Sequence, residues 1–126
     1  MAGLTLDSGA LIAADHDDRP FWILWKEALR RGADVTVPTP VVAQSWRGNR
    51  NARMAQLLAA CVVDPLSELE ARAAGALCGR AKTADAIDAC VVVSAAARDD
   101  AIVTSDVTDI THLVQVARSR AVVLNI

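Results

Sequence analysis

The stretch that decides the fold is residues 85–106, DAIDACVVVSAAARDDAIVTSD. Its first part, Asp85–Ala97, has Ala, Ile, Val and Cys on every side and almost no charge, which predicts a helix that is buried all round. Its second part, Ala101–Thr104, is a short apolar run typical of a buried strand. A buried helix followed directly by a buried strand predicts βαβ units around a parallel sheet.

Segments of the same two kinds alternate along the rest of the chain. Short β-like runs occur at Leu4–Asp7, Asp34–Pro38, Cys61–Val63 and Ala121–Asn125. Helical patterns occur at Gly9–Ala14, Pro20–Arg31, Val41–Trp46, Asn51–Ala60, Ser67–Leu77 and Thr108–Arg118. Ser67 and Glu70 form a capping box, and Gly79 is expected to stop the helix that follows. We therefore expect one domain over residues 1–126, with a parallel sheet of about five strands and six or seven helices.

The composition excludes several classes of protein. Apolar residues make up 53% of the 126, so the chain is globular, and its formal net charge of −2 excludes a strongly basic nucleic-acid coat. A nucleic-acid enzyme of this charge must bind through a local patch or let a metal ion neutralise the phosphate. The cysteines, Cys61, Cys78 and Cys90, fit no zinc or redox motif and are expected to be small buried residues in a reducing compartment. Because neither a signal peptide nor a membrane span is recognisable, we expect a cytoplasmic protein.

Acidic residues stand where acids are costly. Asp7 closes the first strand and Asp106 follows the Ala101–Thr104 strand, so both are expected at the carboxyl edge of the sheet, where ligands bind in α/β folds. Asp88 enters an apolar helix with no basic residue three or four positions away. Burying an unpaired carboxylate in this way destabilises the fold by on the order of several kcal/mol, unless a bound cation compensates its charge.

Hard oxygen ligands without His or Cys select Mg²⁺ or Mn²⁺, and such an ion can activate water and stabilise a phosphodiester transition state. Structural alternatives exist for each acid. Asp7 and Ser8 can cap the following helix, Asp85 is the natural N-cap of its helix, and Asp88 is in the position favoured by the helix dipole. For Asp109, a purely structural role and a role in supporting the metal ligands are both open.

The same segments resemble the PIN domain family, in particular VapC-type ribonuclease toxins of toxin–antitoxin pairs. The resemblance covers the whole chain and rests on three motifs in order. These are Leu6–Ile12 with its early acid, Asp85–Ala96 with Asp88 heading an Ala-rich helix, and Ile102–Ile110 with its Thr-x-Asp turn.

The resemblance implies a three-layer α/β/α sandwich and an acidic pocket that binds Mg²⁺ or Mn²⁺. It implies Asp7, Asp88 and Asp106 as catalytic metal ligands with Asp109 beside them, and Ser8, Asp85 and Thr104 as residues that support these ligands. It also implies an RNA substrate, a homodimer and a small antitoxin that blocks the pocket.

One position departs from the family pattern. The family's usual second acid is a Glu in a short helix, and here the matching position holds Gln44. A Gln carbonyl can hold a cation or its water but adds no charge, so weaker metal binding is expected. The alternative function is a PIN-fold protein that no longer cleaves and that binds an antitoxin or RNA.

Further binding residues are suggested by the run after Gln44. Arg47, Arg50 and Arg53 can pair with phosphates, and Trp46 can stack on a base. A solvated loop or a salt-bridging surface for an antitoxin is the structural alternative. Trp22 and Trp25 are expected in the core or in a partner groove, and His16 and His112 at the surface.

An aspartate-based phosphotransfer protein is a third possibility, which Asp7 at the end of the first strand would suit. Against it, no second acid lies two residues after Asp7, and no Lys follows a later strand.

Overall fold

A computed structural model describes residues 2–48 and 51–126. Its centre is a sheet of five parallel strands in the order β3-β2-β1-β4-β5. The strands are β1 (Leu4–Leu6), β2 (Val35–Pro38), β3 (Val62–Asp64), β4 (Ala101–Thr104) and β5 (Val123–Asn125). The predicted parallel sheet is therefore confirmed, and β1 lies at its centre with β2 and β4 on either side.

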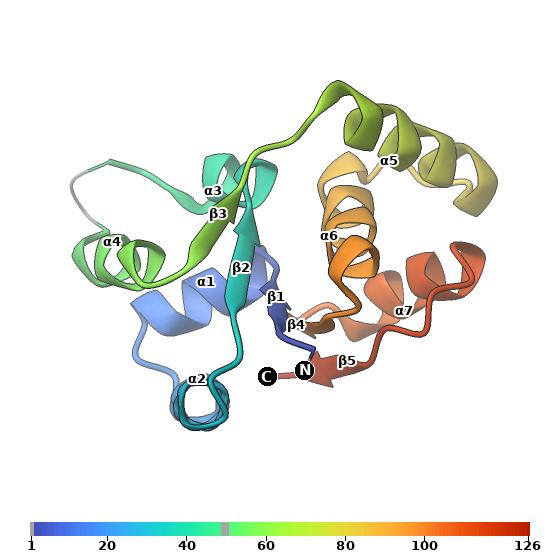
Figure 1. Ribbon diagram of the computed structural model, residues 1–126. Helices are drawn as coiled ribbons and strands as arrows, with labels where there is room; N and C mark the ends of the chain where they lie inside the picture. Colours follow the sequence, from blue (N-terminus) through green and yellow to red (C-terminus); the bar gives the residue numbers. More distant parts are fainter. Residues whose placement is uncertain (1, 49–50) are drawn as a thin grey trace.

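Seven helices connect the strands within the described residues. They are α1 (Ser8–Asp15), α2 (Arg19–Arg30), α3 (Thr39–Ser45), α4 (Ala52–Ala59), α5 (Glu68–Ala81), α6 (Ala86–Arg98) and α7 (Val107–Val116). Figure 1 shows α1, α2 and α4 on one side of the sheet and α5, α6 and α7 on the other. The expected three-layer α/β/α sandwich is thus confirmed.

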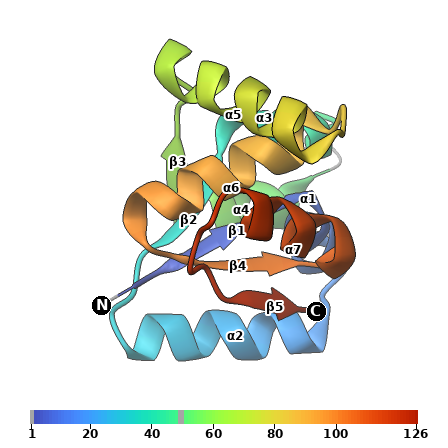
Figure 2. The ribbon, with the colours of Figure 1, turned by 90° about the vertical axis from the view of Figure 1, so that its right-hand side faces the viewer.

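The helix predicted from residues 85–97 forms the centre of its layer. Figure 2 shows α6 lying between α5 and the sheet, with α2 on the opposite side of the sheet. Its Ala, Val and Cys side chains from Ala89 to Val92 are buried, as is Ala95. A helix covered by both the sheet and a second helix needs apolar residues all round, which explains its lack of charge.

One predicted helix boundary is wrong. Gly79 does not stop α5, which continues to Ala81 and ends at Lys82 in the left-handed conformation (φ 56°). The backbone N–H of Lys82 donates to the carbonyl of Cys78 and closes the last turn. Packing of α5 against α6 and α7 supports the helix through the glycine, whose intrinsic cost is only about 1 kcal/mol. At the other end the cap by Ser67 is confirmed, because its Oγ accepts from the Glu70 N–H at 3.1 Å. The Glu70 carboxylate accepts from the Ser67 hydroxyl at 3.0 Å.

The parallel topology brings the carboxyl ends of neighbouring strands to one edge. In Figure 2 the arrowheads of β1, β4 and β5 point towards the side on which α7 begins. Asp7 follows β1 directly, and Asp106 follows β4 by two residues. No helix among the described residues is long and apolar enough to cross a membrane.

Candidate metal centre

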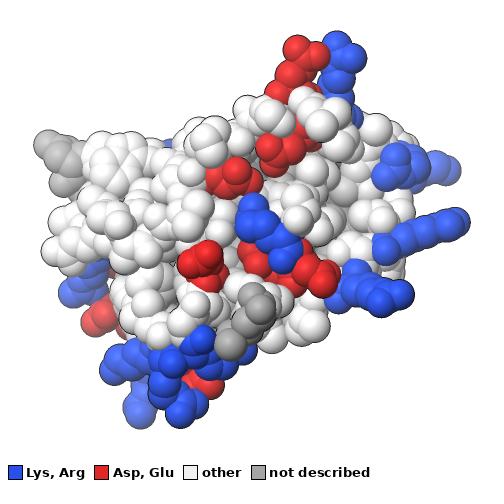
Figure 3. Space-filling view, in the orientation of Figure 1, with Lys and Arg blue, Asp and Glu red and all other residues white. Residues whose placement is uncertain are grey.

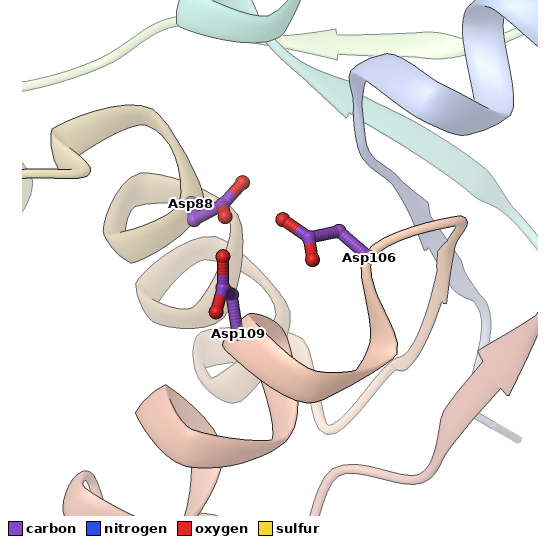
Figure 4. Close-up of side chains that lie close together, drawn as sticks. All are labelled: Asp88, Asp106 and Asp109. Carbon is purple, nitrogen blue, oxygen red and sulfur yellow. The ribbon is translucent and has the colours of Figure 1, made fainter.

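Three carboxylates converge at this edge. Asp88, Asp106 and Asp109 each offer an oxygen atom, and these oxygen atoms lie within 4.8 Å of one another. Figure 4 shows the three side chains pointing towards a common point, Asp88 from α6, Asp106 from the turn before α7 and Asp109 from α7 itself. We call these residues the carboxylate triad. Like charges at this separation repel unless protons or a cation neutralise them.

Asp88 carries the strongest sign that a partner belongs here. Its side chain is 9% exposed, and its Oδ2 is buried without a hydrogen-bond partner in the described part of the chain. Burial raises the pKa of Asp88 to about 7, helped by the hydrogen bond and charge of Asp85 and by the charges of Asp106 and Asp7. A divalent cation would provide a partner for this oxygen. It would also stabilise the charged form of Asp88 and so lower the pKa of this residue.

Asp85 is the N-cap residue of α6, as the sequence predicted. Its Oδ1 accepts a hydrogen bond from the backbone N–H of Asp88 at 3.1 Å, at the start of α6. The cap fixes the first helical turn and thereby the direction in which the Asp88 side chain leaves the helix.

Asp7 differs from the triad because both of its oxygens are engaged. The side chain is 3% exposed; Oδ1 accepts from the Ala10 N–H at 3.0 Å, and Oδ2 accepts from the Thr104 hydroxyl. The capping role that the sequence allowed for Asp7 is therefore confirmed. Burial raises the pKa of Asp7, opposed by these hydrogen bonds and assisted by the charge of Asp106. The structure thus places Asp7 beside the triad, while its role as a ligand stays a prediction.

Thr104 joins the two acidic turns. Its hydroxyl donates to Asp7 and accepts from the backbone N–H of Asp106 at 2.8 Å. Asp106 is the N-cap residue of α7, and its side chain makes no capping hydrogen bond. Desolvation and the charge of Asp109 raise the pKa of Asp106. Thr104 therefore holds Asp7 in place and positions the turn that presents Asp106.

Gly9 allows these turns to meet. A Cβ placed on Gly9 would overlap the side chain of Ser105 and would lie 3.2 Å from the Ser105 backbone nitrogen. Only glycine permits α1 to approach the turn after β4 this closely. Sequence reasoning did not assign this role, because the neighbour lies 96 positions further along the chain.

Gln44 and Ser8 lie on the other side of Asp7. The Ser8 hydroxyl donates to Oε1 of Gln44, which connects the first turn of α1 to α3. The carbonyl that was expected to face a cation is therefore engaged by Ser8. Whether this pair contributes to metal binding stays a prediction.

The expected RNA-binding residues follow α3. Trp46 is 38% exposed, and the Arg47 guanidinium donates to the Trp46 carbonyl at 2.7 Å. Arg50 lies outside the described residues. Arg53 is on α4, where it pairs with Asp17 at 3.6 Å across an exposed surface. Of the described arginines in this run, Arg47 thus follows the end of α3 and Arg53 lies in the first turn of α4.

Other predictions are confirmed in part. Trp22 and Trp25 pack against the core but also line a cavity of about 400 Å³ between α2 and α4, together with Asp17, Arg53, Gln56, Leu57 and Ala60. His16 and His112 are exposed, as expected. Cys90 is buried, whereas Cys61 and Cys78 are only partly buried, and all three are free thiols.

A second cavity was not foreseen. It adjoins the triad and has a volume of about 230 Å³. Its lining joins the α5–α6 loop to α7 and consists of Ala81, Lys82, Thr83, Asp85, Asp88, Asp109, His112 and Leu113. No sequence pattern pointed to it, because Lys82 and His112 meet only through the packing of α5 against α7.

The comparisons with known proteins bear on the fold. No protein-family model matches the sequence, and no curated protein matches it significantly. Several solved structures match, and two of them cover nearly the whole chain. One is a chain of VapBC2 from Rickettsia felis, bound to a DNA fragment from its promoter, with 13% identity, 98% coverage of both chains and a TM-score of 0.71.

The other is a chain of FitAB bound to an IR36 DNA fragment. It is 19% identical, covers 97% of this chain and 94% of its own, and has a TM-score of 0.68. At these identities the similarity establishes a shared fold. The chain has a PIN-like α/β fold, as its motifs predicted, with an acidic cluster at the carboxyl edge of the sheet.

Proposed function

We propose that this protein is a Mg²⁺- or Mn²⁺-dependent endoribonuclease of the VapC-like toxin type. The observation that carries the proposal is the carboxylate triad with the orphaned Oδ2 of Asp88 at its buried side. Three carboxylates without His or Cys form a hard oxygen site, which suits these two cations.

The residues of the site fit such an ion. Asp88, Asp106 and Asp109 would hold it, with Asp7 beside them. A bound ion supplies two effects, a lowered pKa for a water molecule and stabilisation of the oxyanions of a phosphodiester transition state. The chain's own part is to fix the carboxylates: Asp85 orients Asp88, and Thr104 orients Asp7 and Asp106.

RNA binding is proposed for the surface around α3. Trp46 presents an exposed aromatic face for stacking on a base. Among the described residues the Arg47 guanidinium donates only to backbone carbonyls, so a phosphate can compete for it as a charged partner. For Arg50, which lies outside the described residues, RNA binding is proposed from the sequence alone.

Partners are proposed from the fold neighbours and from one surface. The two structural neighbours are chains of VapBC2 and FitAB, each bound to a DNA fragment. The cavity lined by Trp22 and Trp25 offers an apolar wall with Arg53 at its rim, and the Trp22 indole nitrogen there is buried without an acceptor in the described structure. A small antitoxin with an apolar anchor fits this surface. We also propose a homodimer and a cytoplasmic location.

A second candidate function is favoured by one specific observation. Gln44 stands where an acid is expected, and its carbonyl already accepts from Ser8. A site with one charge fewer binds cations more weakly. The chain would then act as a PIN-fold binding module for an antitoxin or RNA.

The experiment that tests both functions is RNA cleavage by the purified protein with Mg²⁺, with Mn²⁺ and with EDTA. Asp88→Asn removes a charge at the triad, and Asp34→Asn changes an exposed carboxylate away from it as a matched control. Metal-dependent cleavage that is lost in Asp88→Asn and kept in Asp34→Asn supports the nuclease. Cleavage by Gln44→Glu but not by the parent supports the binding module. Cleavage that persists in EDTA contradicts the metal mechanism.

A further inference from the structure

The cavity beside the triad is lined by some of the residues predicted for the site but not by others. It shares Asp88 and Asp109 with the triad, whereas Asp7, Ser8 and Gln44 do not line it. The triad therefore lies between two flanks, one formed by α1 and α3 and the other by this cavity. A polynucleotide whose scissile phosphate is held at the triad continues in both directions, so it must extend over both flanks.

The non-acidic wall of the cavity offers a set of complementary groups. Lys82 ends α5 and has an exposed side chain, and it forms no ion pair with any described residue. The Thr83 hydroxyl accepts from the Asp85 N–H at 3.2 Å, so its own hydrogen is free to donate. Ala81 and Leu113 add apolar surface. A cation, a hydroxyl donor and an apolar wall suit the phosphate, ribose and base of one nucleotide.

His112 adds a hydrogen-bond acceptor, because a neighbouring carbonyl group fixes the tautomer of its ring. Its Nε2 lies 3.0 Å from the carbonyl oxygen of Ala81. A carbonyl can only accept, so Nε2 carries the proton, and Nδ1 of the neutral ring is an acceptor that no described residue uses. Ribose hydroxyls and exocyclic amines of bases are donors that such a nitrogen can accept.

Charge makes occupation of the cavity depend on the metal. Asp85, Asp88 and Asp109 would repel a phosphate from a cation-free site. A divalent cation at the triad removes this repulsion and leaves Lys82 as the free positive charge on the opposite wall. Nucleotide binding in the cavity is therefore expected only when the metal is present.

The outer surface on this flank is positively charged. Figure 3 shows Lys and Arg side chains projecting from the side of the molecule where α5 and α7 lie. The exposed cations at the ends of these two helices that form no ion pair with any described residue are Arg80, Lys82, Arg118 and Arg120. Such an edge attracts an RNA backbone that leaves the cavity.

We infer that this cavity is a subsite for the single RNA nucleotide next to the scissile phosphate, on the flank opposite Trp46. The inference rests on the proposed nuclease function. The volume of about 230 Å³ is below the roughly 300 Å³ at which pockets for larger ligands begin, so it leaves room for no more than one nucleotide unit. Lys82 contacts the adjoining phosphate, and Thr83 and His112 contact the ribose or base.

Two measurements on the full chain test this subsite. In the first, kcat and KM for a fluorescently labelled single-stranded RNA are compared in Mg²⁺ for the parent, Lys82→Met and Lys82→Arg. Lys26→Met is the matched control, since Lys26 is the only other lysine and lies exposed on α2. In the second, adenosine 5′-monophosphate is titrated with and without Mg²⁺ while backbone amide NMR shifts are followed.

The inference predicts a split between the two kinetic constants. Lys82→Met should raise KM about tenfold, equal to about 1.4 kcal/mol, with little change in kcat. The salt dependence of log KM should become shallower by about 0.7, the value for one phosphate contact with a single strand. Lys82→Arg should retain most of the affinity, and Lys26→Met should match the parent. Mononucleotide shifts should centre on Thr83 and His112, require Mg²⁺ and disappear in Lys82→Met.

The possible outcomes distinguish a failure of the subsite proposal from a failure of the proposed nuclease function. Cleavage with equal KM in Lys82→Met and Lys26→Met overturns the subsite and leaves the nuclease standing. No cleavage by the parent, with Mg²⁺-dependent shifts at the cavity that Lys82→Met removes, supports nucleotide binding there and counts against the nuclease. No cleavage and no shifts at the cavity overturn both.

Discussion

The hydroxyl of Thr104 donates a hydrogen bond to the buried carboxylate of Asp7, from β4 to the turn that follows β1. The same hydroxyl accepts from the N–H of Asp106. One side chain thus connects the turns that follow two adjacent parallel strands. This connection fixes the spacing of acids that the sequence separates by about a hundred positions.

Replacing Thr104 with Val should remove both hydrogen bonds at nearly constant volume. Because Asp7 stays buried, it would lose a donor that its carboxylate needs, and we expect a loss of about 1–3 kcal/mol in the free energy of unfolding. Urea denaturation measures this directly. Thr108→Val on the exposed start of α7 is the control and should change stability by less than about 0.5 kcal/mol. Equal effects of both changes would contradict the role given to Thr104.

The raised pKa of Asp88 predicts how stability depends on pH. Because the folded-state pKa is about 7, above the ordinary 3.8, the folded chain holds this proton more tightly than the unfolded chain does. This contribution to stability is therefore full below about pH 4 and is lost as the pH rises through 7. Burial raises the pKa of Asp7 and desolvation that of Asp106, which act in the same direction.

Thermal unfolding of the metal-free parent and of Asp88→Asn between pH 4 and 8 tests this dependence. The difference in stability should shift in favour of Asp88→Asn as the pH rises, by on the order of a few kcal/mol. Mg²⁺ should raise the melting temperature of the parent at pH 8 and have little effect at pH 4, where protons occupy the site. Parallel stability curves for the two proteins would show that Asp88 is not the group responsible.

Gly9→Ala should be destabilising because the added Cβ meets the Ser105 turn. Overpacking of this kind costs about 1–3 kcal/mol, although alanine is the better helix former. Gly75→Ala is the matched control inside α5, where an added Cβ meets nothing within 4 Å; we expect it to stabilise by about 0.5–1 kcal/mol. Chemical denaturation of both variants measures the contrast, and a stabilising Gly9→Ala would refute the close approach.

Arg98 anchors the far end of the helix that carries Asp88. Its guanidinium pairs with Asp100 at 3.0 Å and with Asp64 at 3.2 Å, and it donates to Thr5 on β1 at 2.9 Å. Asp100 is 4% exposed, so removing its partner leaves a buried charge. Arg98→Met should cost about 3–5 kcal/mol.

The matched control for Arg98→Met is Arg72→Met. Arg72 pairs with Glu68 at 2.9 Å on a fully accessible face of α5. Removing this exposed pair should cost less than about 1 kcal/mol. Urea midpoints of the two variants compare the two environments, and similar losses would contradict the importance assigned to the Arg98 network.

The sequence by itself determined most of the architecture. Alternating strand and helix patterns predicted the parallel sheet, and the almost uncharged run in residues 85–97 predicted the buried α6. Local chemistry also predicted the caps made by Ser67 and Asp85, because a cap depends only on residues a few positions away. The position of Asp106 near Asp7 followed from the rule that parallel strands end at one edge.

Tertiary structure alone decided the details of the site. The second oxygen of Asp7 accepts from the hydroxyl of Thr104, 97 positions away, and no local pattern reports such a contact. The continuation of α5 through Gly79 depends on its packing against α6 and α7, which outweighs a weak intrinsic preference. The cavity between Lys82 and His112 exists because α5 and α7 meet in space. Local interactions select the elements, whereas burial and long-range hydrogen bonds determine which side chains come together.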